Sequence, residues 1–298
     1  MSDKLEYLLV SRDSIDPTVV IVTLNRPKKL NSMNVGMLSE LHRVFSVDLV
    51  CDLSTVRVVI IVGSGDRAFT SGLDLMDAKV GEILNPSIVT SPGDRSVALK
   101  RTIDCMQLPI LAIANFPRPV IAYINGACIG LGVDIASACD IRICSSSAVF
   151  GVKEIKIGIC ADLGSLFFLP RICKSDSWVR EICYSGRNWL ASEALQQGFV
   201  SQIGASALEL ARNIAQNPPI ATEGIKVHLN HSIRNRLAEC FDLVSVWNSI
   251  RLQETQVIAE CVGKVLAKMP SKLYINCLVC LCVPHERCEC VYMFFSIA

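Results

Sequence analysis

The sequence has little net charge and no long apolar run, and each absence excludes a class of protein. Its 29 Lys and Arg residues against 28 Asp and Glu residues leave a formal charge of +1. The total charge therefore gives no reason to expect a nucleic-acid partner. No stretch reaches the ~20 uninterrupted apolar residues of a membrane span. There is also no repeat of fixed period, which argues against a solenoid or a propeller.

The first residues lack the features of a targeting leader. Residues 1–14, MSDKLEYLLVSRDS, mix both charges from the start. They contain neither an apolar core segment nor an Arg- and Ser-rich stretch that is poor in acids. We therefore expect neither secretion nor a cleaved mitochondrial leader.

Cysteine is abundant, with 15 residues, but its distribution does not predict a disulfide framework. Ten cysteines lie before residue 270, mostly inside apolar runs, as Cys139 and Cys144 do. In a reducing compartment such cysteines act as small buried hydrophobic residues. The other five lie within residues 277–290, beside His285, at spacings that a zinc site uses. Their biased surroundings favour an unfolded tail, so we expect no metal.

Strand and helix patterns alternate along a chain that is 51% hydrophobic and long enough to bury a sizeable core. Such alternation predicts an α/β fold. Residues 77–117 are predicted to form a long loop with one helix near residues 96–106. From residue 192 to 268 the pattern is mostly helical, with a hinge at residues 217–219. We expect a core over residues 1–216, a helical C-terminal region over 217–270 and an atypical Cys-rich tail over 271–298. The strands are predicted at residues 19–24, 56–62, 119–124 and 141–144, and the earlier helices at 32–50 and 129–138.

Two turns are suited to hold a negative charge. Residues 126–134, GACIGLGVD, lead from a strand into a helix, so that backbone N–H groups and a helix N-terminus face one point. Many α/β turns are rich in glycine for steric reasons alone, so this signal is weak by itself. A second turn, at Ser71, Gly72 and Leu73, offers a further backbone donor. Asp74 is expected to form that turn.

Three carboxylates lie in apolar surroundings, at Asp134, Glu154 and Asp162. Acidic side chains are rarely buried without a reason, and apolar surroundings raise their pKa toward the range useful for proton transfer. Each also has a structural interpretation. Asp162 suits a helix N-cap or an Asx-turn, Glu154 suits an ion pair with its flanking lysines, and Asp134 suits a cap or a solvent-facing position.

Several motifs, in order, resemble the enoyl-CoA hydratase/isomerase (crotonase) family. The resemblance covers about residues 5–268 and implies an α/β fold, a crotonase-type ββα spiral core with a helical C-terminal region. It also implies an acyl-CoA substrate, no cofactor beyond the CoA of that substrate, and a homotrimer or homohexamer. The motifs are residues 25–33 (NRPKKLNSM), 68–75 (AFTSGLDL), 118–122 (RPVIA), the Gly-rich turn, 139–142 (CDIR) and 192–200 (SEALQQGFV).

The three acids narrow the resemblance within the family. Hydratases use two glutamates twenty positions apart, and Asp134 and Glu154 occupy those places here. Asp162 stands where hydratases have a small residue. The set resembles the dienoyl-CoA isomerases, which would make Glu154 and Asp162 a proton-transferring pair on opposite sides of the substrate, with Asp134 lining the pocket and assisting.

The resemblance also implies an oxyanion hole and a substrate-binding segment. The oxyanion donors would be the N–H groups of Leu73 and Leu131. Leu131 departs from the family, which usually has glycine at this place, so a side chain now stands where the backbone must approach the substrate. The implied oxyanion and substrate-binding residues are Ser71, Gly72, Leu73, Asp74, Leu75 and Leu131.

Two alternatives remain open at this point, an enoyl-CoA hydratase and a non-catalytic acyl-CoA-binding protein.

The C-terminal tail contains a signal for location within the cell. Ser271-Lys272-Leu273 is a peroxisomal address when it ends a chain, but twenty-five residues follow it here. We predict a peroxisomal location for a form ending at Leu273 and a cytosolic one for the tailed form, in preference to the mitochondrion.

Overall fold

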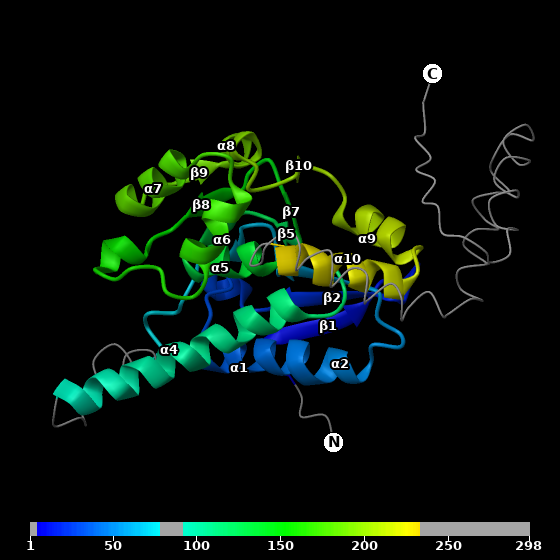
Figure 1. Ribbon diagram of the computed structural model, residues 1–298, viewed down its shortest axis with the longest axis horizontal. Helices are drawn as coiled ribbons and strands as arrows, with labels where there is room; N and C mark the ends of the chain where they lie inside the picture. Colours follow the sequence, from blue (N-terminus) through cyan, green and yellow to red (C-terminus); the bar gives the residue numbers. More distant parts are fainter. Residues whose placement is uncertain (1–4, 78–91, 233–298) are drawn as a thin grey trace, which may run out of the picture. The chain divides into compact units, whose positions relative to one another are not determined.

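The computed structural model describes residues 5–77 and 92–232, and two sheets organise them (Figure 1). In the six-stranded sheet β1 pairs antiparallel with β2, and all later pairs are parallel. Its strands, in spatial order, are β1 (Leu8–Arg12), β2 (Val19–Leu24), β3 (Val58–Gly63), β5 (Val120–Ile124), β7 (Ile141–Cys144) and β10 (Gln202–Ile203). The four-stranded sheet consists of β4 (Ala68–Thr70), β6 (Ala127–Ile129), β8 (Val149–Gly151) and β9 (Trp189–Leu190).

Helices connect the strands and cover the larger sheet. The α-helices are α1 (Val35–Arg43), α2 (Leu49–Cys51), α4 (Pro92–Asn115), α5 (Leu131–Ala138), α6 (Ser165–Ile172), α7 (Asp176–Ser185), α8 (Ala191–Gln197), α9 (Ala207–Ala215) and α10 (Pro219–Ser232). Three short helical turns complete the described elements, namely η1 (Pro27–Lys29), η2 (Val44–Asp48) and η3 (Glu154–Ile157).

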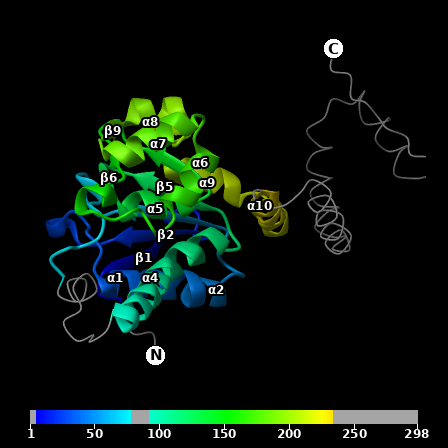
Figure 2. The same ribbon diagram turned by 60° about the vertical axis from the view of Figure 1, so that its left-hand side comes forward.

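The inner strands β2, β3 and β5 of the six-stranded sheet are largely buried on both faces, which explains their continuous runs of Val and Ile. Successive side chains of a strand point to opposite faces. Val58 and Ile60 pack with the small residues of α9, whereas Val59 and Ile61 pack in the larger cluster that includes residues of α1 and α4. Figures 1 and 2 both show α1 and α4 side by side on that second face.

A strand–strand–helix unit recurs along the chain and forms the predicted ββα spiral. One strand enters the large sheet, the next enters the small sheet, and a helix returns. The units are β3-β4-α4 and β5-β6-α5, and β7-β8 begins a third. Each first strand therefore ends beside the small sheet, and the turns that follow β4 and β6 meet there. The α/β prediction is confirmed.

The predicted strands are confirmed, each to within two residues, but the prediction for residues 77–117 was wrong in part. Residues 92–115 form one long helix, α4, instead of a loop with a short helix. Pro92 and Gly93 suggested a loop, although proline is well tolerated in the first turn of a helix. Pro109 lies inside the same helix, where tertiary packing outweighs its low helical propensity. The small sheet was not predicted, because its strands have only two or three residues.

A buried lysine attaches α10 to the core. Lys226 is 6% exposed, and its Nζ lies 2.7 Å from Asp140 Oδ2 and 3.2 Å from the Arg118 carbonyl oxygen. The expected hinge at residues 217–219 falls at the junction of α9 and α10, and Pro219 is the first residue of α10. The C-terminal region expected at 217–270 is described only as far as residue 232, so the rest of it and the 271–298 tail lie outside the described residues.

Trp189, in strand β9 of the small sheet, packs against three other aromatic rings. Its indole stacks on Phe150 at 5.8 Å between centroids and meets Trp178 and Phe199 edge to face. Trp189 is 1% exposed, and its Nε1 has no hydrogen-bond partner within the described structure. The indole therefore stabilises the small sheet by packing and not through its N–H group.

We expect Trp189→Ala to lower the free energy of unfolding by roughly 3–5 kcal/mol, because it opens a large cavity. Trp189→Phe should cost less than about 1.5 kcal/mol, since it keeps a ring and removes an unpaired buried donor. Urea titration followed by circular dichroism measures both. Equal losses in the two variants would contradict the packing role.

Candidate active site

The two predicted oxyanion turns lie against each other. Gly72 has φ +92°, and a Cβ on it would lie 2.7 Å from the Ile129 carbonyl oxygen and 3.7 Å from the Leu131 backbone nitrogen. This close approach requires glycine at position 72. The turn is held from the other side as well, because the Met33 N–H donates to the Gly72 carbonyl and the Asp74 N–H donates to the Met33 carbonyl.

Two backbone N–H groups of these turns remain available to a ligand. Leu131 begins α5, where the first N–H groups of a helix have no partner within the helix. Within the hydrogen bonds of the described residues, neither Leu73 N–H nor Leu131 N–H donates to another protein group. A pair of free donors in a buried turn is suited to bind an oxyanion.

A cavity of about 350 Å³ opens beside these turns. Its walls are mainly apolar, and two carboxyl-bearing residues, Glu154 and Asp162, contribute to them. Three residues of α4 close one side with helical spacing, namely Leu99, Ile103 and Met106. The predicted site residues that line the cavity are Ser71, Gly72, Leu73, Leu75, Leu131, Glu154 and Asp162.

Glu154 stands next to the oxyanion turns. It is the first residue of η3, and its Oε1 lies 3.0 Å from where a Cβ on Gly130 would be. Its Oε2 is buried and makes no hydrogen bond within the described structure. Desolvation by burial raises the pKa of Glu154, and the nearby Asp162 carboxylate adds to the increase. The expected alternative, an ion pair with Lys153 or Lys156, is not found; the Lys153 ammonium donates to the Gly186 carbonyl instead.

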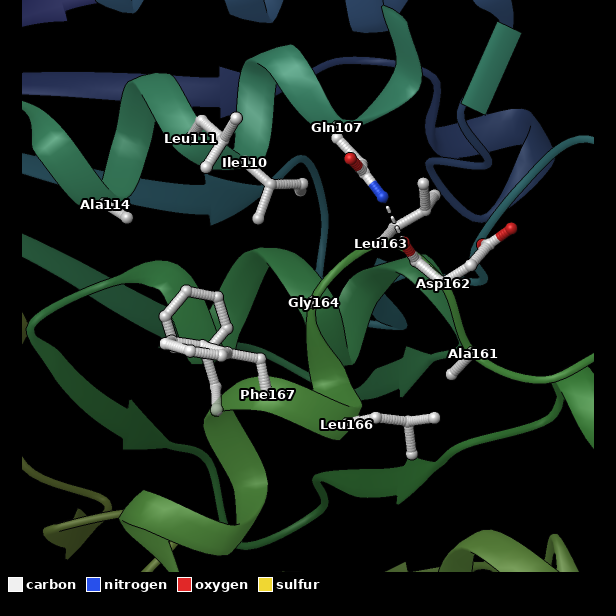
Figure 3. A pocket seen from close by; sticks show the side chains of 11 residues that line it. Gln107, Ile110, Leu111, Ala114, Ala161, Asp162, Leu163, Gly164, Leu166 and Phe167 are labelled. Carbon is white, nitrogen blue, oxygen red and sulfur yellow. Dashed lines mark hydrogen bonds between the residues drawn. The ribbon is translucent and has the colours of Figure 1, made fainter. Parts of the chain in front are cut away.

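Asp162 enters the cavity from the segment between η3 and α6. Asp162 is partly exposed, and the partial burial of its carboxyl raises the pKa of that group. Figure 3 shows the carboxylate pointing away from Ile110, Leu111 and Phe167. Asp162 is not the N-cap of α6, which is Gly164.

Asp134 lies behind the cavity and not among the residues that line it. It is 1% exposed, and its Oδ1 accepts hydrogen bonds from the N–H and the hydroxyl of Ser165, both at 2.6 Å. Desolvation raises the pKa of Asp134 to about 7, against the two hydrogen bonds, which lower it. The carboxyl thus joins α5 to the first residue of α6.

Asp74 serves the turn, as expected, and does not line the cavity. One carboxylate oxygen lies 2.9 Å from an Arg26 guanidinium nitrogen, and the other accepts from the Met76 N–H at 3.3 Å. This ion pair fixes the segment on which Leu73 and Leu75 face the cavity.

The sequence analysis did not identify Leu99, Ile103 and Met106 as cavity residues. Their spacing of four and three places them on one face of a helix and was a usable signal.

Neither a metal site nor a membrane span is found in the described part of the chain. Residues 5–77 and 92–232 contain no group of three or more His, Cys, Asp or Glu side chains placed to hold an ion. No helix in these ranges is both long and apolar enough to cross a bilayer. The cysteine cluster at residues 277–290 lies outside the described residues.

Replacing Asp134 by Asn should change how stability depends on pH. The folded-state pKa of about 7 lies above the ordinary value near 3.8, so the folded chain binds the proton more tightly than the unfolded one. Stability therefore falls as pH rises between these two values, by roughly 4 kcal/mol in all. Asp134→Asn should remove this part of the slope, because the amide stays neutral and still accepts from Ser165.

Urea titrations at several pH values measure this difference. Asp176→Asn is the matched control, since Asp176 is an exposed partner of Arg180 on α7. A wild-type slope that persists unchanged in Asp134→Asn would show that the buried carboxyl is ionised at low pH.

Comparison with known proteins gives a consistent picture. The family model for enoyl-CoA hydratase/isomerase matches residues 14–258. The chain is 38% identical over 277 residues to the mitochondrial Delta(3,5)-Delta(2,4)-dienoyl-CoA isomerase of Rattus norvegicus, covering 89% of this chain and 82% of that one. It is 36% identical over 276 residues to the peroxisomal protein of the same name from Arabidopsis thaliana, covering 90% of this chain and 97% of the relative.

Solved structures share the fold. An enoyl-CoA hydratase from Bacillus anthracis matches with a TM-score of 0.72 and 28% identity, over 86% of this chain and 96% of that one. A putative enoyl-CoA hydratase from Thermobifida fusca, in complex with CoA, matches with a TM-score of 0.71 and 28% identity, over 84% and 94%. The shared fold over most of each chain agrees with the family match. The chain belongs to the enoyl-CoA hydratase/isomerase family.

Proposed function

We propose that this chain is a dienoyl-CoA isomerase that converts 3,5-dienoyl-CoA to 2,4-dienoyl-CoA in fatty-acid beta-oxidation. Glu154 and Asp162 line one cavity, and this observation carries the proposal. The same cavity is lined by Leu73 and Leu131, whose backbone N–H groups have no partner within the described structure. The relatives from rat and Arabidopsis that bear this activity in their names support it.

The position of each carboxyl suggests its substrate atom. A thioester oxygen held by the Leu73 and Leu131 N–H groups places the thioester carbon at the turns. Glu154 is next to Gly130, one residue from the second donor, so it is assigned to the carbon beside the thioester, C2. Asp162 belongs to a different segment of the wall and is assigned to the far end of the diene, C6.

The proposed reaction moves one proton in and one proton out. Glu154 takes a proton from C2, and the electron pair of that C–H bond passes into the conjugated system as an enolate that extends over both double bonds, a trienolate, with its charge on the thioester oxygen. The two N–H donors stabilise this oxyanion. Asp162 then gives its proton to C6, and the double bonds come to rest at C2 and C4. Burial raises the pKa of both carboxyls, which makes Glu154 a stronger base and keeps more of Asp162 protonated.

The position of Asp134 favours isomerisation over hydration. A hydratase that used Asp134 and Glu154 would need both carboxyls to face one water molecule. Asp134 is bonded to Ser165 and does not line the cavity. A non-catalytic acyl-CoA-binding protein would have no use for a buried, unpaired oxygen on Glu154, because leaving it unpaired costs free energy that binding alone does not recover.

Binding, assembly and location follow from the same proposal. The substrate is an acyl-CoA, and no cofactor is required because proton transfer needs none. We propose a homotrimer or homohexamer. For location we propose the peroxisome for a form that ends at Leu273 and the cytosol for the tailed form. Relatives include both peroxisomal and mitochondrial proteins.

Removing either carboxyl should abolish most of the activity. With 3,5-octadienoyl-CoA, we expect the ultraviolet absorbance of the conjugated 2,4-dienoyl product to grow with the wild type. Glu154→Gln and Asp162→Asn should each lower kcat by roughly 100- to 10,000-fold, the usual contribution of a positioned acid or base.

The exposed carboxylate variant Asp176→Asn should keep wild-type activity. Incubation with a 2-enoyl-CoA separates the alternatives, because a hydratase consumes the conjugated double bond and an isomerase does not. Wild-type hydration without isomerisation would overturn the proposal, as would a folded wild type that binds acyl-CoA and catalyses neither reaction.

The Leu131 N–H can be removed separately from its side chain. Leu131 is the first residue of α5, a position where proline is well accommodated. Leu131→Pro should therefore fold but lose about 100- to 1,000-fold in kcat, as other enzymes do when one oxyanion donor is removed. Leu131→Ala keeps the donor and should stay within about tenfold of the wild type. Equal losses in both variants would assign the effect to the side chain.

A further inference from the structure

Gln107 of α4 is the polar member of an apolar helical stripe. Gln107, Ile110, Leu111 and Ala114 follow the spacing i, i+3, i+4, i+7, and all four line a second cavity of about 360 Å³. Side chains at this spacing share one face of a helix. The opposite wall of this cavity is formed by residues of the 161–168 segment.

The amide of Gln107 reaches the segment that carries Asp162. Its Nε2 donates to the Asp162 backbone carbonyl oxygen at 2.7 Å, across 55 residues of sequence (Figure 3). Among the hydrogen bonds of the described residues, none other joins a side chain from another element to residues 160–163. The neighbouring residues Ala161 and Leu163 are buried. Hydrophobic burial is non-directional, so it does not set the orientation of a peptide group. The bond from Gln107 is therefore what fixes the orientation of the peptide group at Asp162.

The helix that provides this bond is itself well anchored. Ile110 and Ile113 are 2% and 0% exposed, and α4 packs against α1. Asn230 of α10 donates to the Ala114 carbonyl oxygen at 3.1 Å. Gln107 thus ties a well-packed helix to a segment that belongs to no helix or strand at residues 159–162.

We infer that Gln107 is a positioning residue for Asp162, one that sets where this carboxyl meets the far end of the diene. The inference rests on the proposed function. Gln107 is not placed at the oxyanion turns or beside Glu154, since it lines the second cavity and not the first. Its loss should therefore impair proton delivery at C6 and leave proton removal at C2 intact.

The test measures the two proton transfers separately. In D₂O, 3,5-octadienoyl-CoA exchanges its C2 hydrogens through Glu154, and mass spectrometry of recovered substrate follows this exchange. Ultraviolet absorbance follows the complete isomerisation. Gln107→Met keeps the length of the side chain without its donor. We expect its kcat for isomerisation to fall 10- to 100-fold, since a shift of about 1 Å at a reacting group has an effect of this size. Its KM and its C2 exchange rate should stay within about twofold of the wild type.

Two further variants make the result specific. Gln107→Glu replaces the donor by a carboxylate facing the Asp162 carbonyl and should lower kcat more than Gln107→Met does. Asn230→Leu is the matched control, because it removes an equivalent amide-to-carbonyl bond on α4, far along the helix from Asp162. It should keep kcat, KM and exchange within about twofold of the wild type.

Other outcomes would overturn the inference. Equal losses of exchange and isomerisation in Gln107→Met, an unchanged kcat, or a matching loss in Asn230→Leu would each do so. Failure of the proposed function is distinguishable, because the wild type would then neither exchange nor isomerise. In that case the positional claim is tested by amide hydrogen exchange of a peptide spanning residues 159–164. Faster exchange in Gln107→Met alone supports the claim, and unchanged exchange rejects it.

Discussion

The site depends on one steric condition, the absence of a side chain at Gly72. The turn after β4 and the turn after β6 approach so closely that a Cβ at this position would meet the Ile129 carbonyl oxygen at 2.7 Å. The approach brings two unpaired N–H groups, from Leu73 and Leu131, to one end of a cavity. The ββα spiral makes it possible, because the parallel pairing of β4 and β6 delivers both turns to the same edge. In the proposed reaction, these donors hold the substrate on which the carboxyls act.

The three acids of the site divide into two kinds by their partners, and only Asp134 is fully buried. Glu154 and Asp162 keep their carboxyls toward the cavity, and desolvation raises the pKa of each. Asp134 has a raised pKa for the same reason but is bonded to Ser165. Burial alone therefore does not identify a reacting group. The hydrogen bonds around each carboxyl distinguish a group that is free to exchange protons from one that supports the structure.

The sequence predicted those strands and helices whose residue pattern lies within one short segment of the chain. The Val- and Ile-rich strands, the start of α5 after a Gly-rich turn and the α/β alternation all follow from residue pattern. The length of α4 did not, because Pro92, Gly93 and Pro109 obscured a helix that packing stabilises. Motif order predicted one site for seven residues, and the structure brings them to one cavity, namely Ser71, Gly72, Leu73, Leu75, Leu131, Glu154 and Asp162. The direction in which Asp134 points, and the bond from Gln107, depend on contacts between distant segments that no local pattern encodes.

The bond between Asp134 and Ser165 has a consequence for which substrates fit. Leu131 and Asp134 lie within one turn of α5, and Ser165 follows Asp162 by three residues, so this bond links the oxyanion donor to the segment bearing the far acid. In the proposed reaction, this bond would hold the two ends of the reacting unit at a fixed separation. An acyl group whose double bonds began one carbon further from the thioester would then present the wrong carbon atom to Glu154 and to Asp162. Regioselectivity would then come from the rigidity of two joined helices, with no need for the cavity to recognise the double bonds themselves.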